Sequence, residues 1–232
     1  MDTLTDKLSE NQRELDKLLG VGRNYDVINR DLYVGSRKGR LYVIAGYGDD
    51  GVIERITSFL LGHGGELAAD AADMQDFINR CVTFCEVDCE NDLDKIMKGA
   101  FIGKTILLLE GFDYCAMMDA KQFPGRGVEE PSDGKVLRGS HDGFTETLVQ
   151  NTALLRRRIR DPYFTLESHQ VGGRSRTDVV LAYMENQVDQ KMLEELRQKL
   201  GKINAGSIAM SQESVAESIV KPQWYNPFPK VR

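Results

Sequence analysis

The chain has 232 residues, of which 41% are hydrophobic and 28% charged, and its net charge is −6 at pH 7. This composition is typical of a globular protein, and the acidic balance argues against broad contact with a nucleic-acid backbone, which requires a net basic face. No window of the sequence approaches the about 18 to 20 continuous apolar residues that span a bilayer, and no signal-peptide core follows Met1. We therefore expect a soluble polypeptide that is long enough for two domains.

In chain order, the first half predicts helices that alternate with two hairpins. Residues 4–19 have the apolar spacing of an amphipathic helix, which Gly20 ends. Residues 26–34 and 40–47 alternate well enough for two strands, and the turn between them makes a hairpin. The other elements predicted in this half are a helix after Gly51, helices at 73–79 and 92–98, a strand at 82–87, and a second hairpin at 104–109 and 114–119.

The sequence changes character at residues 120–134, which hold two prolines and three glycines. Such a composition is typical of a linker, so we expect the chain to divide there. The predicted parts are an N-terminal α/β subdomain over 1–119, a second α/β subdomain over 135–220, and an extended connector over 221–232.

A polar loop then leads into one strongly periodic helix, within residues 135–161. The positions expected on its packed face recur every three or four residues: Phe144, Leu148, Asn151, Leu155 and Ile159. Ser140 or Asp142 can cap its first turn, and Pro162 stops it. Four arginines close this helix, and we expect them to be solvated at its negative end: Arg156, Arg157, Arg158 and Arg160.

The last part of the chain predicts strands at 163–171, 178–183 and 206–210, with a helix at 189–200. Residues 34–45 also align without a gap over 171–182, which indicates an internal duplication. Each half would then hold a helix, a β-hairpin and a packing helix on a small mixed sheet. The predicted fold class is therefore α/β (α+β), with two similar subdomains joined by the linker.

Two groups of residues invite a chemical interpretation that their spacing does not support. Residues 99–105 contain glycines and a Lys-Thr pair, but a phosphate loop needs four residues between its glycines and a helix after them, whereas this segment has three residues and a predicted strand. Cys81, Cys85 and Cys89, with His63, lack the close cysteine pairing that holds one zinc ion. We predict no metal site and no cofactor.

The adjacent Ser140, His141 and Asp142 are also a weak candidate for nucleophilic catalysis. A nucleophile, its base and the group that orients the base normally come from distant segments of a chain. Capping and loop structure are the expected roles of these residues, and we predict that the chain is not an enzyme.

The loop and the periodic helix resemble a known family. The segments that carry the resemblance are RGSHDGFTE at 138–146, LLRRRIRDP at 154–162, FPGRGVEEP at 123–131 and YNPFPKVR at 225–232. They are similar to the GerA family of spore germination proteins. Members commonly read RGPREGF in the loop, whereas here Ser140 and His141 replace the Pro-Arg pair and Asp142 replaces the Glu. This difference points to one branch of the family and away from the A subunits of nutrient receptors.

The resemblance implies a cytosol-facing, two-lobed region of a protein in the inner spore membrane, which acts in assembly, gating or coupling of ion release during germination. The implied partners are other germination proteins of that membrane, with a homo-oligomer left open and with the membrane reached through a further C-terminal region. No nucleic acid is expected. The alternative is a module that binds a small, germinant-like ligand in a cleft between the two subdomains.

Three sets of residues are the predicted contact sites. The loop that couples the lobes or meets a partner is Arg138, Gly139, Ser140, His141, Asp142, Gly143, Phe144 and Glu146. The linker set is Phe123, Pro124, Gly125 and Arg126. The membrane-proximal connector set is Trp224, Asn226, Pro227, Phe228 and Pro229. Arg138 can pair with an acidic residue of its own loop or reach across a subunit boundary.

Overall fold

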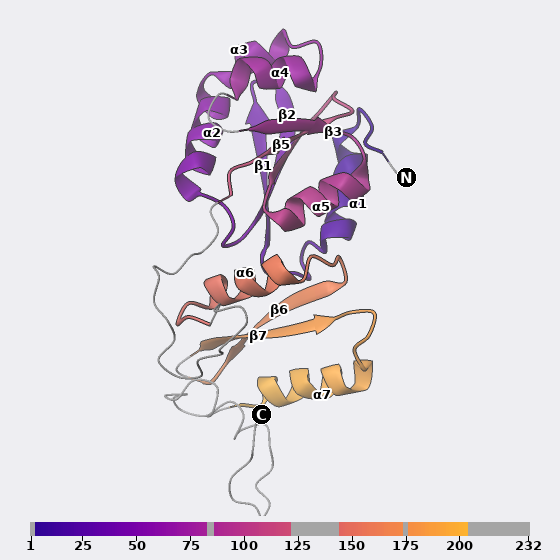
Figure 1. Cartoon of the computed structure of the whole chain (residues 1–232), viewed down its shortest axis with the longest axis vertical. Helices are drawn as coiled ribbons and strands as arrows, with labels where there is room; N and C mark the ends of the chain where they lie inside the picture. The colour runs from indigo at the N-terminus through magenta and orange to yellow at the C-terminus, as the bar shows by residue number, and fades with distance from the viewer. Residues whose placement is uncertain (1–2, 83–85, 122–143, 174–175, 204–232) are drawn as a thin grey trace, which may run out of the picture. The chain divides into compact units, whose positions relative to one another are not determined.

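The computed structural model of the chain describes residues 3–82, 86–121, 144–173 and 176–203 (Figure 1). Contacts between Cα atoms divide the chain into two units, and the division falls between Phe164 and Thr165. Among the residues of these ranges, no helix is both long and apolar enough to cross a membrane.

The first unit is built on a five-stranded sheet with the strand order β1-β2-β4-β5-β3. All of its strand pairs are antiparallel, where the sequence led us to expect a mixed sheet. Its strands are β1 (Val27–Val34), β2 (Arg37–Ile44), β3 (Val87–Glu90), β4 (Thr105–Leu109) and β5 (Cys115–Met118). Every residue of β4 and β5 is buried, as expected for central strands that are covered on both faces.

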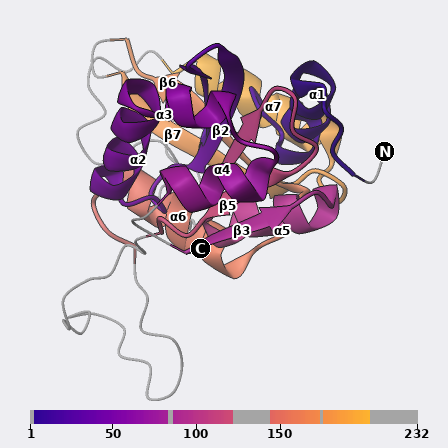
Figure 2. The same cartoon turned by 90° about the horizontal axis from the view of Figure 1, so that it is seen from above.

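Helices cover the two faces of this sheet and form a separate core on each. Tyr42 and Ile44 of β2 belong to one core, together with α1 (Leu8–Leu19) and α5 (Leu93–Ile102). Leu41 of the same strand belongs to the other core, with α2 (Asp50–Gly62) and α4 (Met74–Cys81). A short helix, α3 (Gly64–Ala69), lies between α2 and α4 in the chain, and Figure 2 shows these three helices together. The two cores follow from the alternation of side chains along a strand.

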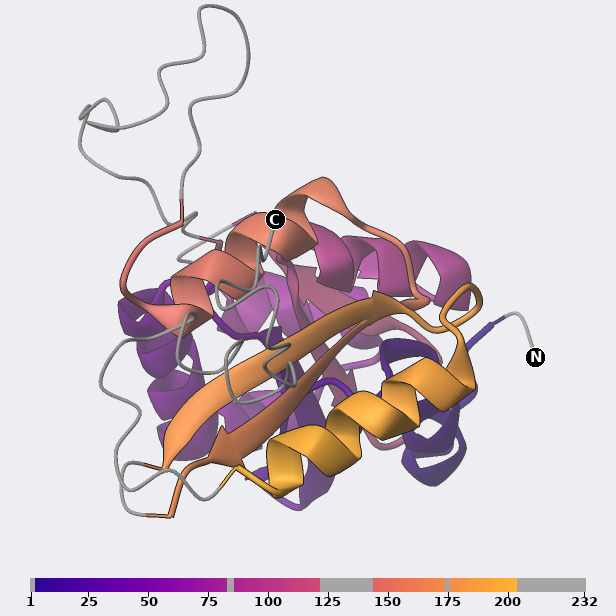
Figure 3. The same ribbon diagram turned by 90° about the horizontal axis from the view of Figure 1, so that it is seen from below.

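The second unit is smaller. β6 (Phe164–Val171) and β7 (Thr177–Met184) form a two-stranded sheet, and α7 (Gln190–Gly201) lies along it (Figure 3). Its core consists of Val171, Leu200 and Ile203, with Val179 and Leu181 packed against them. Two isolated strands would be marginal in water, so the packing of the α7 apolar face is what this hairpin needs for stability.

The α/β fold class and both predicted hairpins of the first half are confirmed, but several boundaries differ. The predicted strand at 82–87 is β3 at Val87–Glu90 instead, and α3 was not predicted at all. The predicted strand at 206–210 lies outside the described residues. α5 runs through Gly99, where the prediction ended it. A Cβ there would come within 2.9 Å of the Met117 sulfur, so glycine at this position lets the helix pack closely against β5. The helix ends at Gly103, whose φ of 104° suits glycine.

The internal repeat has a counterpart in the structure. The order helix, hairpin, helix occurs twice, as α1, β1, β2, α2 and as α6, β6, β7, α7. In both copies an aspartate, Asp49 or Asp189, caps the last helix through its side chain. The gapless alignment of residues 34–45 over 171–182 is wrong, however. The connection between β6 and β7, at 172–176, is longer than the Gly35–Ser36 turn between β1 and β2. When β1 is aligned with β6, a gap is therefore needed before β2 can be aligned with β7.

The division between the two units differs from the predicted one. Most of the predicted linker at 120–134 lies outside the described residues, so a boundary there stays a prediction. α6 (Leu148–Arg158) was expected to open the second subdomain, yet its contacts place it in the first unit. Ala153 of α6 belongs to the same core as α1 and α5, which explains this assignment.

Candidate functional site

The beginning of α6 is fixed by a side chain that folds back from inside the helix. Asn151 accepts a hydrogen bond from the backbone N–H of Thr145 at 2.6 Å and donates one to the carbonyl of the same residue at 2.7 Å. Thr147 occupies the cap position without a side-chain bond. The helix therefore begins at Leu148, three residues after Thr145, and the caps predicted at Ser140 and Asp142 lie too far upstream in the sequence to close its first turn.

The same arrangement occurs at the start of α1. Asn11 accepts from the N–H of Thr5 at 2.9 Å and donates to its carbonyl at 2.7 Å. In both copies the threonine hydroxyl also lies 3.3 Å from the asparagine oxygen. We call this pair of bonds the Thr–Asn lock. Its recurrence at the first helix of both repeats supports the duplication, since it matches in atoms as well as in element order.

Arg156 of α6 is the centre of the candidate site. Its side chain is fully buried, and its guanidinium makes two bonds to the buried carboxylate of Asp26, Nε to Oδ2 and Nη2 to Oδ1, both at 2.9 Å. The remaining Nη1 donates to the carbonyl of Phe164 at 2.7 Å. Arg156 thus joins three parts of the first unit: the helix α6, the residue that precedes β1, and the last residue before the division between the units.

Two aromatic rings enclose the guanidinium. The Arg156 Cζ atom lies 5.1 Å from the ring centroid of Phe101 on α5 and 5.1 Å from that of Phe164. Such contacts place a weakly hydrated, planar cation against the negative faces of the rings. Burying an ion pair removes both charges from water, so the pair is stable only because these hydrogen bonds and rings replace the lost hydration. We call Arg156, Asp26, Phe101 and Phe164 the arginine clamp.

Polar and small residues beside the clamp hold α6 against the sheet. The hydroxyls of Tyr25 and Thr152 lie 2.5 Å apart. Gly46 takes a left-handed φ of 79°, and a Cβ there would come within 3.1 Å of Val149, so the helix approaches the backbone closely. Burial raises the pKa of Tyr47 to about 12, despite the opposing effect of Arg156. The phenol therefore stays neutral at physiological pH.

The packed face of α6 is not the one that the spacing predicted. Its buried residues are Thr152, Ala153 and Arg156, whereas Leu148 and Leu155 are half-buried. The prediction that all four terminal arginines are solvated is wrong for Arg156, because its partner Asp26 lies far away in the sequence and gives no local signal. The other three are exposed: Arg157, Arg158 and Arg160.

Most of the predicted contact residues lie outside the described part of the chain. This applies to residues 138–143 of the loop, to the linker set at 123–126 and to the connector set at 224–229. Of the loop set, Phe144 has an exposed fraction of 64% and Glu146 is also exposed. The contact roles of these residues stay predictions.

The groups considered for chemistry in the sequence lie partly outside the described residues, as Cys85 and the Ser140–His141–Asp142 run do. In the described part of the chain, no three His, Cys, Asp or Glu residues form a group that could hold a metal ion. Cys81 and Cys115 are buried, and burial raises the pKa of the half-buried Cys89 thiol to about 11. Lys104 pairs with Asp88 and precedes β4, so the segment at 99–105 has the strand predicted after it.

Comparison with known proteins identifies the family to which the chain is similar. The model of the family described as Bacillus/Clostridium GerA spore germination protein matches residues 13–232. Stage V sporulation protein AF of Bacillus subtilis (strain 168) is 33% identical over 224 residues, which cover 97% of this chain and 45% of that protein. Spore germination protein KA of the same organism is 26% identical over 231 residues, which cover 98% of this chain and 41% of that protein.

Two further similarities concern the membrane and the fold. The Bacillus subtilis protein named uncharacterized membrane protein YfkQ is 28% identical over 158 residues, which cover 68% of this chain and 30% of that protein. The crystal structure of the N-terminal domain of the A subunit of the Bacillus megaterium spore germinant receptor GerK3 matches with a TM-score of 0.68 at 21% identity, over 96% of this chain and 82% of that one. The chain thus spans less than half the length of these curated relatives and shares the fold of the solved domain.

Proposed function

The chain belongs to the GerA family of spore germination proteins, and we propose that it is the water-exposed N-terminal region of a longer germination protein. In this proposal, movements of its two units are coupled to the release of ions during germination. Support comes from the share of the relatives that it spans, 45% of stage V sporulation protein AF. A relative named as a membrane protein supports a membrane part in the remainder. We place the intact protein in the inner spore membrane, with this region facing the cytosol.

The arginine clamp is the observation that carries this proposal. A region that transmits movement needs a rigid connection where the chain leaves the first unit, because packed elements pass on displacements and loose ones absorb them. Arg156 holds the Phe164 carbonyl at 2.7 Å, immediately before the division between the units. The proposed role is therefore mechanical: the clamp fixes where the second unit begins, and partner proteins act on that second unit or on the loop before α6.

The test replaces Arg156 by lysine in the full-length protein. Lysine keeps a positive charge beside Asp26 but cannot make the two-pronged bond and reach Phe164 at the same time. We expect slower ion release during germination, measured as potassium efflux, at a protein abundance close to that of the parent. Arg158→Lys is the matched control, since Arg158 is an exposed residue of the same helix, and it should leave efflux unchanged. Normal efflux at normal abundance in Arg156→Lys would contradict the proposal.

The loop set around Arg138 belongs to the same proposal as the surface that meets neighbouring germination proteins or further copies of the chain. Its support is the family resemblance of residues 138–146 and its place directly before the Thr–Asn lock of α6. Arg138→Ala in the full-length protein should impair germination without lowering abundance. If germination is normal at normal abundance, Arg138 has no such role.

A further inference from the structure

One end of the second unit carries a cluster of exposed basic side chains. Arg176 directly precedes β7, whereas Lys199 and Lys202 lie in the last turn of α7 and just after it. The two segments meet, because the Gly172 N–H donates to the carbonyl of Ile203 at 3.2 Å. We call Arg176, Lys199 and Lys202 the basic end of this unit.

The charges of the basic end are not neutralised within the protein. None of the three side chains forms an ion pair in the part of the chain that the structure describes. Two acidic residues lie near them in the sequence. Asp178 accepts a hydrogen bond from Gln170 at 3.2 Å, and Glu195, one helical turn before Lys199, does not reach ion-pair distance from it. Three uncompensated positive charges thus gather on a chain whose net charge is −6.

Arg176 occupies its position against a backbone preference. Its φ of 44° lies in the left-handed region that favours glycine, and no other non-glycine residue in the described ranges has a positive φ. The Cβ of an L-residue is disfavoured in this conformation, and residues held in it are concentrated at functional sites. An arginine where glycine would fit without strain therefore points to a use for its charge.

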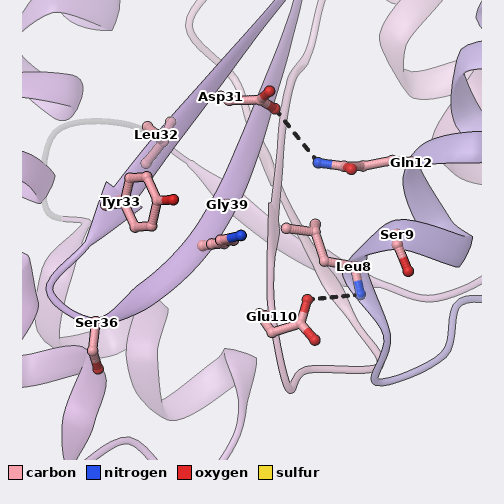
Figure 4. A pocket seen from close by; sticks show the side chains of 10 residues that line it. Leu8, Ser9, Gln12, Asp31, Leu32, Tyr33, Ser36, Gly39 and Glu110 are labelled. Carbon is pink, nitrogen blue, oxygen red and sulfur yellow. Dashed lines mark hydrogen bonds between the residues drawn. The ribbon is translucent and has the colours of Figure 1, made fainter.

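The equivalent end of the first copy is closed by packing instead. The turn between β1 and β2 lies against α3, since a Cβ on Gly35 would come within 2.6 Å of the Gly65 backbone. Figure 4 shows Ser36, an uncharged residue of this turn, among the residues that line a pocket of about 600 Å³. The neighbouring Arg37 lies 4.6 Å from the centroid of the Phe112 ring. The first copy thus uses this end for internal contacts, whereas the second leaves it charged and exposed.

The partner that fits the basic end is the phosphate surface of a membrane. This step rests on the proposed function, in which a membrane part follows the present chain. Ile203 is the last described residue of the second unit and lies at the basic end, so the residues from 204 to 232 continue from there. Lysine and arginine near an anionic bilayer each add to the attraction, and a unit tethered beside the surface needs few of them to stay on it.

We propose that the basic end of the second unit docks on anionic lipid headgroups. Arg176, Lys199 and Lys202 meet the lipid phosphates, to which both kinds of side chain donate charged hydrogen bonds. The net negative charge of the chain as a whole opposes any other orientation on such a surface, because the acidic faces are repelled by it. Docking gives the second unit a support against which a displacement of the first unit can act.

The experiment measures sedimentation of the 232-residue chain with lipid vesicles at low ionic strength, where screening is weakest. One set of vesicles contains one third phosphatidylglycerol, which is anionic, and two thirds phosphatidylcholine; the other set is pure phosphatidylcholine. We expect binding to the anionic vesicles that falls as salt is added, and roughly a hundredfold weaker binding to the neutral ones. Equal binding to both sets, or no binding to either, overturns the proposal.

A double variant assigns the lysine contacts. Lys199→Gln combined with Lys202→Gln should weaken binding to the anionic vesicles by a factor of roughly 25. Lys17→Gln combined with Lys191→Gln is the matched control, because both are exposed helical lysines outside the basic end and their loss changes the net charge equally. The control should bind within about a factor of two of the parent chain. An equal loss in both double variants would mean that net charge alone governs binding, and the docking surface would then be rejected.

Arg176→Asn removes the third charge and keeps the turn, because asparagine adopts the left-handed conformation more readily than arginine. Binding to the anionic vesicles should fall roughly fivefold, with no decrease in the midpoint of urea unfolding. Unchanged binding would remove Arg176 from the surface and contradict the reason given for its backbone conformation.

Soluble poly-L-glutamate tests the rival partner, an acidic protein. Tighter binding of this polymer than of the anionic vesicles, at equal concentrations of negative charge, would assign the basic end to a protein partner and overturn the lipid proposal. None of these measurements involves ion release. A negative vesicle result therefore leaves the coupling role of the arginine clamp untouched, and normal potassium efflux in Arg156→Lys leaves a positive vesicle result standing.

Discussion

Helices α1 and α6 begin with the same hydrogen bonds, but the residue five positions after the asparagine makes a different long-range contact in each helix. Both start with a Thr–Asn lock, and Asp16 follows Asn11 at the same spacing as Arg156 follows Asn151. Asp16 accepts from Arg40 at 2.9 Å and from the Tyr42 hydroxyl at 2.8 Å, with 32% of its side chain exposed. Arg156 is fully buried. The local geometry of the helix start is thus retained in both copies, while the long-range contact is different in each.

This comparison also separates two energetic regimes. A partly exposed ion pair keeps most of its hydration in the unfolded and folded states, so it contributes little. A buried pair is held by its partners alone, and removing one member leaves an unpaired charge inside the protein. The first copy should therefore tolerate the loss of its pair, and the second should not.

The largest expected effect is in the arginine clamp. Arg156→Met should lower the free energy of unfolding by about 3–5 kcal/mol, because the Asp26 carboxylate is then buried without a counter-charge. Urea unfolding followed by circular dichroism measures this. Asp26→Leu in the same chain should recover most of the loss, and Arg158→Met should change little. A loss of less than about 1 kcal/mol in Arg156→Met would show that the clamp is not buried in solution.

The next effect compares the two locks directly. Asn11→Ala and Asn151→Ala each remove two hydrogen bonds at a helix start and should each lower stability by about 1–2 kcal/mol. Asn11 is 3% exposed, whereas Asn151 is half-buried, so the loss should be greater in α1. Urea unfolding of the two variants under identical conditions tests the order. Equal losses in the two variants would mean that burial of the lock does not increase its contribution to the free energy of unfolding.

The second unit has a partly buried ion pair of its own, between Glu167 and Arg197, and this pair makes the stability of the protein depend on pH. Glu167 accepts from Arg197 at 2.7 Å and from the Tyr183 hydroxyl at 2.9 Å, and the arginine lowers the pKa of the Glu167 carboxyl. A lowered folded pKa stabilises the protein above the unfolded value of about 4.3, and the stabilisation is lost as the pH falls through the folded pKa. Glu167→Gln should therefore lower stability by about 1 kcal/mol at pH 7 and by little near pH 3.

The control for this prediction is a more exposed acid on the same unit. Glu194 lies 3.6 Å from Arg197 with 57% of its side chain exposed, so Glu194→Gln should have a smaller effect at pH 7. Thermal unfolding at both pH values measures the two variants. A Glu167→Gln deficit that persists undiminished at low pH would mean that packing, and not the charge of Glu167, is responsible.

The smallest expected effect is at the pair in the first copy. Arg40→Gln removes the bonds to Asp16 and Asp31, whose side chains are 32% and 67% exposed, and should lower stability by about 0.5–1 kcal/mol. Added salt should reduce this difference, because exposed ion pairs are screened. The measurement is urea unfolding at low and high ionic strength. A loss as large as that of Arg156→Met would end the contrast between the two copies.

Local patterns were sufficient for much of the fold. The strands β1 and β2 and the amphipathic helices α4 and α7 were predicted near their observed positions from the burial of one face, and the central strands β4 and β5 from their short, continuous apolar runs. The GerA family and the branch of stage V sporulation protein AF were also recognised, and both are confirmed. The short α3 was missed, since it lacks a periodic stripe of sufficient length.

The centre of the candidate site could not be predicted in the same way. Arg156 stands among other arginines at a helix end, where a solvated side chain is the usual outcome. Only the fold brings it to Asp26 and Phe101. The Thr–Asn lock had a signal that was overlooked, because TDKLSEN at 5–11 and TETLVQN at 145–151 share their first, fourth and last residues. That match lies outside the segments used for the repeat.

The bond from Arg156 to the Phe164 carbonyl also determines what happens when the chain is pulled. A pull on Phe164 itself acts through its carbonyl on the Arg156 guanidinium, which lies between the Phe101 and Phe164 rings. The load would pass through Asp26 to the strand β1 beside it, and not along α6 alone. A pull on Phe164 should therefore be shared between α6 and β1 through one buried ion pair.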